Sequence, residues 1–338
     1  MIHRWYKTNL VFMLLISVIL SAHTADTPKI MAKDSKIYVA GHRGLVGSAL
    51  VRQLEAQGYH NLVMATSKEL DLRDKQAVDR FFERERPEFV FLAAAKVGGI
   101  KANNDYPVDF IGDNLAIELN VINAAYENGV KKLIFLGSSC IYPRDCPQPI
   151  KEDYLMTGPL EKTNEPYALA KIAGIGLCQA YNRQYKTRFI SCMPTNLYGP
   201  EDNFDRQSSH VLPALLAKMY EAYKQGLPSV EIWGDGTPRR EFLYVDDLAD
   251  AVIFLMKNYD GAQHINVGTG EDISILELAM LIKDVIGYEG ELVFNSALPN
   301  GTPRKLLDVS SLHDLGWKHT VSLKVGIEKT FDWYKHKA

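Results

Sequence analysis

Tyr167 and Lys171 are four positions apart in a segment that reads as a helix, so their side chains share one face. A lysine cation beside a phenol stabilises the phenolate and draws the pKa of the tyrosine down from about 10. Such a tyrosine can give its proton to a carbonyl group that is accepting a hydride. The pair also occurs by chance on solvated helix surfaces. It gains weight from Ser138, which stands earlier, at the carboxyl end of an apolar run of strand length.

A glycine-rich loop near the start of the chain suggests a second kind of chemistry. It follows an apolar run at 36–40 and opens a helical pattern at 45–56. Its glycines permit a tight turn, and the amino end of the helix offers N–H groups to a pyrophosphate. Three glycines alone are a weak signal, but their place between a strand and a helix predicts a dinucleotide site. The residues of this site are Gly41, His42, Arg43, Gly44, Leu45, Val46 and Gly47.

The end of the second expected strand bears on the choice of dinucleotide. NAD sites commonly carry an acidic residue there, which binds the ribose 2′-hydroxyl. Here residues 65–68 are Ala-Thr-Ser-Lys, and the first acid is Glu69. Arg43 and Lys68 are placed to meet a 2′-phosphate, which favours NADP over NAD. The alternative is that both are solvated surface cations.

Apolar runs of strand length alternate with helical patterns through the first part of the chain. Strands are expected at 36–40, 61–65, 89–94, 132–136 and 189–193. Helices are expected at 45–56, at 113–129 with Asp113 as its cap and Gly129 after its end, and at a segment with Pro166 in its first turn. This alternation predicts an α/β fold with a doubly wound parallel sheet of the Rossmann type.

Loops rich in glycine and proline multiply after about residue 195. We therefore expect an N-terminal extension at 1–30 and an NADP-binding Rossmann domain at 31–195. The remainder, 196–338, should form mainly a smaller C-terminal substrate-binding lobe. Some of its segments, such as a helix at 246–259, should return to the Rossmann domain.

The composition is that of an ordinary globular protein. The 338 residues are 46% hydrophobic and 23% charged, with a net charge of -3. This balance argues against nucleic acid as a partner, because phosphate binders carry clustered lysine and arginine. The four cysteines are too few and too scattered for a disulfide framework, and no CxxC or HxxxH spacing predicts a metal site.

The first thirty residues have a pattern of their own. Arg4 and Lys7 precede an apolar run at 10–20 and small or polar residues at 21–25. This is the order of a signal peptide, and the run is too short to span a bilayer. The alternative is that Met31 is the working start. A cytoplasmic location is expected, because soluble NADPH is found there, and no membrane partner is expected.

Long stretches around these residues identify a family. The chain from about Lys33 to Trp333 resembles the GDP-L-fucose synthases, which belong to the extended short-chain dehydrogenases/reductases, and the first thirty residues lie outside the resemblance. The matching stretches are 41–44, 93–100, 137–143, 163–168, 194–200, 209–211 and 236–242. One departure concerns the cofactor: the family carries arginines near Ala65 and Ser67, which this chain lacks. The NADP preference therefore depends on Arg43 and Lys68.

The resemblance implies roles for individual residues. Ser138, Tyr167 and Lys171 would form the catalytic triad of the reduction by NADPH. Cys140 and His210 would perform two epimerisations, at carbons 3 and 5 of GDP-4-keto-6-deoxy-D-mannose, before it. Without the resemblance, Cys140 would be interpreted as a small buried residue and His210 as an ordinary loop histidine.

The resemblance also implies the binding residues. Besides the glycine-rich loop and Lys68, cofactor contacts are expected from Leu136, Gly137, Ser138, Ser139, Lys171, Pro194, Asn196, Leu197 and His210. Substrate contacts are expected from Lys218, Trp233, Arg240 and Asp308, with Arg304 and Lys305 as further candidates. Lys218 alone could equally be a solvated helix residue. The helices at 113–128 and 166–185 resemble those that form a four-helix dimer interface in the family, so a homodimer is expected.

Three other functions are less compatible with the sequence. A sugar 4,6-dehydratase is expected to carry an Asp-Glu pair where this chain has Ser139 and Cys140. A UDP-hexose 4-epimerase is expected to keep the acid at the end of the second strand. A non-catalytic NADP sensor would typically lose Tyr167 or Lys171, and both are present.

Overall fold

The computed structural model describes residues 31–205, 209–298 and 300–337. The expected leader at 1–30 lies outside these residues. The chain divides into a unit at 1–32 and a second compact unit at 33–338. None of the helices in the described ranges combines the length and the apolar character that a membrane crossing requires.

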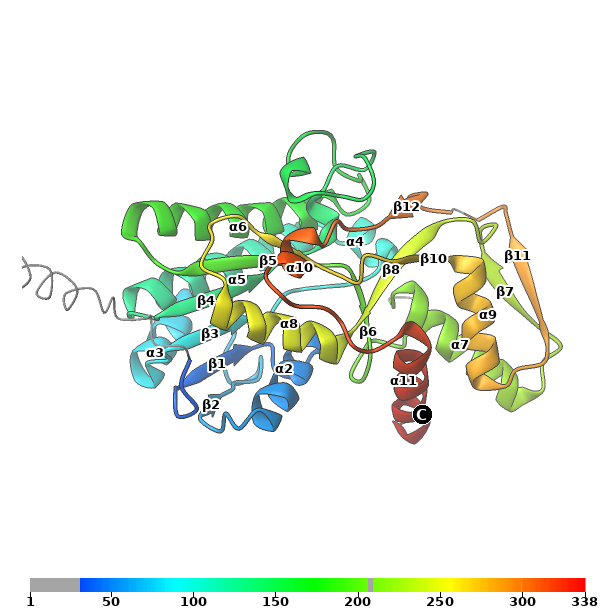
Figure 1. The fold of residues 1–338 in the computed structure, drawn as a ribbon, viewed down its shortest axis with the longest axis horizontal. Helices are drawn as coiled ribbons and strands as arrows, with labels where there is room; N and C mark the ends of the chain where they lie inside the picture. The colour runs from blue at the N-terminus through cyan, green and yellow to red at the C-terminus, as the bar shows by residue number, and fades with distance from the viewer. Residues whose placement is uncertain (1–30, 206–208, 299, 338) are drawn as a thin grey trace, which may run out of the picture. The chain divides into compact units, whose positions relative to one another are not determined.

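A six-stranded parallel sheet forms the centre of this unit (Figure 1). Its order is β2-β1-β3-β4-β5-β9, and every neighbouring pair is parallel. The strands are β1 (Ile37–Ala40), β2 (Leu62–Val63), β3 (Phe89–Leu92), β4 (Lys132–Leu136), β5 (Phe189–Pro194) and β9 (Ile265–Val267). The predicted doubly wound α/β fold is confirmed. The strand order reverses between β1 and β3, and ligands of such folds bind at the carboxyl ends of the strands at this point.

Helices pack along both faces of the sheet (Figure 1). On one face lie α2 (Leu45–Ala56) and α8 (Val245–Asn258), which contact each other. On the other lie α3 (Lys75–Glu85), α5 (Pro107–Glu127) and α6 (Glu165–Tyr185), with α5 packed against both neighbours. Four short helices lie in the connections. They are α4 (Ile100–Asp105) after β3, η1 (Ser139–Ile141) after β4, η2 (Glu152–Tyr154) before α6, and α10 (Ser310–Asp314), which contacts β9.

The later part of the chain builds a second hydrophobic core around residues such as Leu216, Leu278 and Ile327. Its strands are β6 (Asn196–Tyr198), β7 (Ser229–Trp233), β8 (Arg239–Tyr244), β10 (Asp272–Ser274), β11 (Glu291–Asn295) and β12 (Arg304–Lys305). Its helices are α7 (Val211–Gln225), α9 (Ile275–Ile286) and α11 (Leu323–Lys337). Strand β8 pairs with β6, β10 and β12, so residues distant in sequence meet along it.

One helix boundary differs from the expectation. Helix α5 begins at Pro107, not near Asp113. Proline suits a first turn because its φ is already helical and its missing N–H is not needed there. Asp113 therefore lies within the helix and pairs with Lys96 and Arg73 instead of capping it. Gly129 follows the helix end with a φ of 70°, as predicted.

Candidate active site

The loop between β1 and α2 lies tightly against the end of β3. Gly41 has a φ of 85°, and a Cβ on it would lie 2.9 Å from the Cα of Ala94. A Cβ on Gly47 would lie 2.0 Å from the carbonyl oxygen of Gly41. Neither position can hold a side chain without moving backbone. The amino end of α2 has no side-chain cap, so its N–H groups remain suited to a pyrophosphate at the point where the strand order reverses.

Arg43 and Lys68, the two cations expected to meet the ribose, are both exposed. Glu69, the first acid after β2, faces its own loop, and its carboxylate accepts hydrogen bonds of 2.8 Å from the backbone N–H and the hydroxyl of Thr66. These bonds lower the pKa of Glu69, and the charge of Arg43 contributes. Arg43 therefore lies near the end of β2, where the cofactor ribose is expected. Its contact with a 2′-phosphate stays a prediction.

Ser138, Cys140, Tyr167 and Lys171 come together at the carboxyl end of β4. The Oγ atom of Ser138 lies 2.7 Å from the Sγ atom of Cys140, at the start of η1. Tyr167, in the first turn of α6, forms a hydrogen bond with Ser138. Lys171 is 2% exposed, and its Nζ donates to the carbonyl oxygen of Leu136 at 3.0 Å and lies 5.8 Å from the centre of the Tyr167 ring. A thiol, a hydroxyl and a phenol thus line one small volume.

The pKa of Tyr167 differs from the expectation. The sequence predicted that Lys171 lowers it, but the pKa is raised well above the usual value. Burial is the largest cause, followed by the electrostatic interactions with Cys140 and Glu118, while the hydrogen bond with Ser138 lowers it. The phenol is consequently protonated at neutral pH, which is the state a proton donor requires.

His210 directly precedes α7, next to a loop whose residues 206–208 lie outside the description. Although part of the residue reaches solvent, desolvation of the ring lowers its pKa, and the positive charge of Lys305 adds to this effect. At neutral pH the imidazole is therefore neutral and able to accept a proton. The influence of Lys305 also places β12 near this histidine.

The remaining cofactor residues lie at the ends of neighbouring strands. Leu136 is the last residue of β4, and Gly137 and Ser139 follow it. Pro194 ends β5, and Asn196 and Leu197 lie in β6. The N–H of Gly137 donates to the carbonyl oxygen of Cys192 at 2.9 Å, and a Cβ on Gly137 would lie 2.3 Å from the sulfur of Met193. The glycine thus keeps β4 and β5 close beside the catalytic residues.

Arg240 stands out among the predicted substrate residues. Burial lowers the pKa of its guanidinium group, which donates to the carbonyl oxygen of Arg239 at 2.8 Å but has no carboxylate partner within the described residues. A partly buried cation without an acid suits a phosphate group. Arg239 differs, because it pairs with Asp272 at 2.7 Å. Arg304, a weaker candidate, pairs with the same Asp272.

The other predicted substrate residues are more varied. Trp233 is 66% exposed at the end of β7, where a ligand can reach it. Lys218 on α7 donates to the carbonyl oxygen of Glu231. The carboxylate of Asp308 accepts a hydrogen bond of 3.0 Å from the N–H of Ser310 and so supports the start of α10. Their contacts with a substrate stay predictions.

Two buried acids were not singled out from the sequence. The carboxylate of Glu241 is fully buried and accepts hydrogen bonds from the N–H groups of Thr269, Gly270 and Leu307 at 2.6, 2.8 and 3.0 Å. Glu241 lies next to Arg240 in the stretch 236–242, which matches the family, so its place in the sequence could have indicated a role at the site. Glu118, on α5, lies 3.1 Å from the Nζ atom of Lys171. The sequence indicated its burial only through the presence of an acid within an apolar helical pattern.

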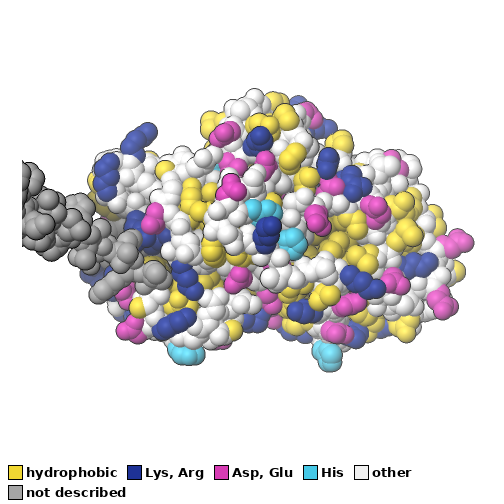
Figure 2. Space-filling model, in the orientation of Figure 1, with side chains coloured by type: hydrophobic (Ala, Val, Ile, Leu, Met, Phe, Trp, Pro, Cys, Tyr) yellow, Lys and Arg dark blue, Asp and Glu magenta, His cyan; other side chains and the backbone are white. Residues whose placement is uncertain are grey.

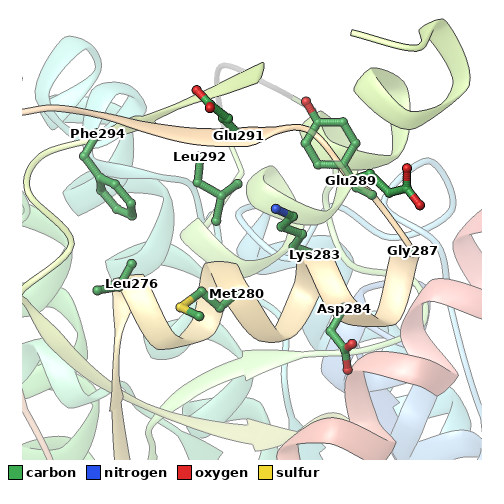
Figure 3. A pocket seen from close by; sticks show the side chains of 10 residues that line it. Leu276, Met280, Lys283, Asp284, Gly287, Glu289, Glu291, Leu292 and Phe294 are labelled. Carbon is green, nitrogen blue, oxygen red and sulfur yellow. The ribbon is translucent and has the colours of Figure 1, made fainter. Parts of the chain in front are cut away.

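The groove in Figure 3 is separate from these residues. It has a volume of about 710 Å³ and lies between α9 and β11, with Met280, Leu292 and Phe294 among its lining side chains. None of the predicted site residues lines it. Elsewhere, Figure 2 shows acidic and basic side chains interspersed over one face of the molecule.

Comparisons with known proteins agree with this arrangement. The model of the NAD dependent epimerase/dehydratase family matches residues 37–268. GDP-L-fucose synthase 1 of Arabidopsis thaliana is 59% identical over 302 residues, which are 89% of this chain and 94% of that protein. The structure of a GDP-L-fucose synthetase from Naegleria fowleri bound to NADP has a TM-score of 0.86 and 32% identity, and covers 93% of this chain and 98% of that chain.

A GDP-mannoheptose C4 reductase from Campylobacter jejuni, solved with NADP bound, is also similar. It is 45% identical, has a TM-score of 0.83, and covers 90% of this chain and 99% of that chain. Sequence and structure thus agree along nearly the whole of the second unit. The chain belongs to the NAD dependent epimerase/dehydratase family, in the branch that includes the GDP-L-fucose synthases.

Proposed function

We propose that the chain converts GDP-4-keto-6-deoxy-D-mannose into GDP-L-fucose, by epimerisation at carbons 3 and 5 followed by reduction of the 4-keto group with NADPH. The observation that carries the proposal is the position of Cys140. Its sulfur lies 2.7 Å from the hydroxyl oxygen of Ser138, which in turn is hydrogen-bonded to Tyr167. A reductase needs the phenol and the serine but has no use for a thiol beside them.

The ketone explains how one site can serve both reactions. It acidifies the protons on carbons 3 and 5, so a base can remove each and an acid can return it on the opposite face. The hydroxyl groups of Ser138 and Tyr167 stabilise the negative charge that develops on the ketone oxygen. Cys140 and His210 exchange the protons at carbon.

Reduction uses the same oxygen-binding groups. NADPH, when held by the loop at 41–47, supplies the hydride to carbon 4. Tyr167 gives its proton to the alkoxide, and Lys171 stabilises the phenolate that remains. The substrate diphosphate is held by Arg240. Incubation of the purified protein with NADPH and the keto sugar should yield GDP-L-fucose by NMR, and an absence of NADPH oxidation would contradict the proposal.

A second candidate is a GDP-sugar C4 reductase that does not epimerise. The similarity to the Campylobacter jejuni C4 reductase favours it. The two candidates differ in one observable, because only an epimerase exchanges the protons on carbons 3 and 5 with solvent when NADPH is absent. Deuterium uptake into the keto sugar in deuterium oxide decides between them.

Arg43→Ala is expected to weaken the preference for NADPH over NADH by tenfold or more, since one charged contact with the 2′-phosphate contributes about 1.4 kcal/mol. Dissociation constants for both cofactors, measured by fluorescence titration, test this. Arg84→Ala, which removes an exposed arginine of α3, is the control and should leave the ratio unchanged. Equal affinities of the parent protein for the two cofactors would overturn the assignment.

Arg240→Met is expected to raise the KM for the GDP-sugar by about 10- to 100-fold, because a hydrogen bond to a charged group contributes about 1.5–3 kcal/mol. The value of kcat should change less, since the diphosphate is remote from the reacting carbons. Steady-state kinetics measure both. Arg188→Met is the control: it removes an arginine that pairs with Asp260 and is not among the predicted substrate residues, so KM should stay near that of the parent.

Assembly and location complete the proposal. Apolar side chains are exposed along α5 and α6, and we propose that these helices form a homodimer interface. They are Val108, Leu115, Leu119, Leu169 and Tyr185. A cytoplasmic location follows from the pools of NADPH and nucleotide sugar on which this reaction depends.

A further inference from the structure

Glu118 is a buried acid that the mechanism above does not use. It lies on α5 and is 2% exposed, and its Oε1 atom is 3.1 Å from the Nζ atom of Lys171 on α6. Within the described residues, neither carboxylate oxygen has a well-aligned hydrogen bond. Burial raises the pKa of Glu118, and the positive charge of Lys171 beside it opposes that shift. A carboxylate buried in this way is costly unless a cation lies beside it. Its position therefore depends on Lys171.

Helix α6 leaves room for this carboxylate. A Cβ on Gly174, one turn after Lys171, would lie 2.8 Å from the Oε2 atom of Glu118 and 2.5 Å from the ring of Phe135. A glycine inside a helix costs about 1 kcal/mol relative to alanine. The helix thus carries a glycine where a larger residue would displace the acid.

Lys171 is held from three sides. Its ammonium group donates to the carbonyl oxygen of Leu136, lies 3.1 Å from Glu118, and lies 4.6 Å from the centre of the Phe135 ring. The side chain is consequently fixed beneath Tyr167. Its positive charge is shared between the phenol, which it would make more acidic, and the carboxylate, which opposes that effect.

We propose that Glu118 is a positioning residue for the reduction: it fixes the ammonium group of Lys171 and offsets its charge, so that Tyr167 stays protonated over a wider range of pH. This inference rests on the reductase activity proposed above. Glu118 acts on two titratable groups of α6, Tyr167 and Cys178, and Cys140 after β4 also acts on Tyr167. Burial raises the pKa of Cys178 to about 12, so this thiol stays neutral.

Glu118→Gln tests the inference, because it removes the charge and keeps the shape. Without the negative charge, Lys171 acts on the phenol unopposed and the pKa of Tyr167 falls. Reduction requires the protonated phenol, so the alkaline limb of the kcat profile should move to lower pH by about one unit or more. The KM for the GDP-sugar should stay near that of the parent, since the acid lies behind Lys171.

Tyr181→Phe is the matched control, because the hydroxyl of Tyr181 donates to Asn123 at 2.6 Å across the same two helices without carrying a charge. Its pH profile should equal that of the parent. If Glu118→Gln does not fold, Glu118→Asp provides the test. It keeps the negative charge but moves it one methylene away from Lys171, so the alkaline limb of the kcat profile should move to lower pH by a smaller amount. A folded variant with the parent's profile would overturn the inference. An inactive parent would instead contradict the proposed function.

Discussion

Cys140→Ala is expected to lose deuterium exchange at carbons 3 and 5 of the keto sugar by a factor of roughly 100 to 10,000, the usual contribution of a positioned acid–base group. The measurement is NMR of the sugar in deuterium oxide without NADPH, where the parent should exchange both positions. Hydride transfer needs no acid or base at carbon. With NADPH the variant should therefore slowly release an unepimerised 6-deoxy sugar, because Tyr167 and Lys171 remain.

Two further variants sharpen this test. Cys146→Ala removes the other half-buried cysteine, also a free thiol, and should exchange like the parent. His210→Ala should impair inversion while leaving exchange at the carbons where Cys140 is the base. Unchanged exchange in Cys140→Ala would show that the thiol only packs, and would favour the C4 reductase.

Tyr167→Phe is expected to bind NADPH with the affinity of the parent yet to lower the rate of reduction by roughly 100-fold or more, because it removes the proton donor. The ring should keep its edge-to-face contact with Phe110, whose centre lies 6.4 Å away, so the fold should be preserved. NADPH oxidation and cofactor titration measure the two properties. Tyr181→Phe serves as the control on the same helix, and retained reduction in Tyr167→Phe would remove the phenol from the mechanism.

Much of the fold could be predicted from local patterns. The expected helix at 45–56 coincides with α2, and the expected strand at 132–136 coincides with β4. These elements have clear apolar runs bounded by glycine or polar residues. The predicted start of α5 was wrong, because Asp113 resembles a capping residue, whereas the helix begins at Pro107, six positions earlier. Pro107 was not considered as a start, although proline is common in the first turn of a helix.

The candidate site was only partly predictable, because its electrostatics depend on contacts between distant segments. The spacing of Tyr167 and Lys171 indicated a shared helix face, but it held no information about Glu118 on another helix. The expected effect of Lys171 on the phenol was therefore reversed by burial and by that carboxylate. The influence of Lys305 on His210 likewise arises only when β12 pairs with β8.

Glu241 has a mechanical consequence for the loops around the site. Its carboxylate accepts the N–H groups of Thr269, Gly270 and Leu307, while its own carbonyl oxygen accepts the amide of Asn196 at 2.7 Å. One residue of β8 thus ties together the segments that follow β5, β9 and β12. A loop that moved outward alone would leave this buried carboxyl group with fewer hydrogen-bond donors, which is costly. A movement of any one of these loops is therefore coupled to the other two through Glu241.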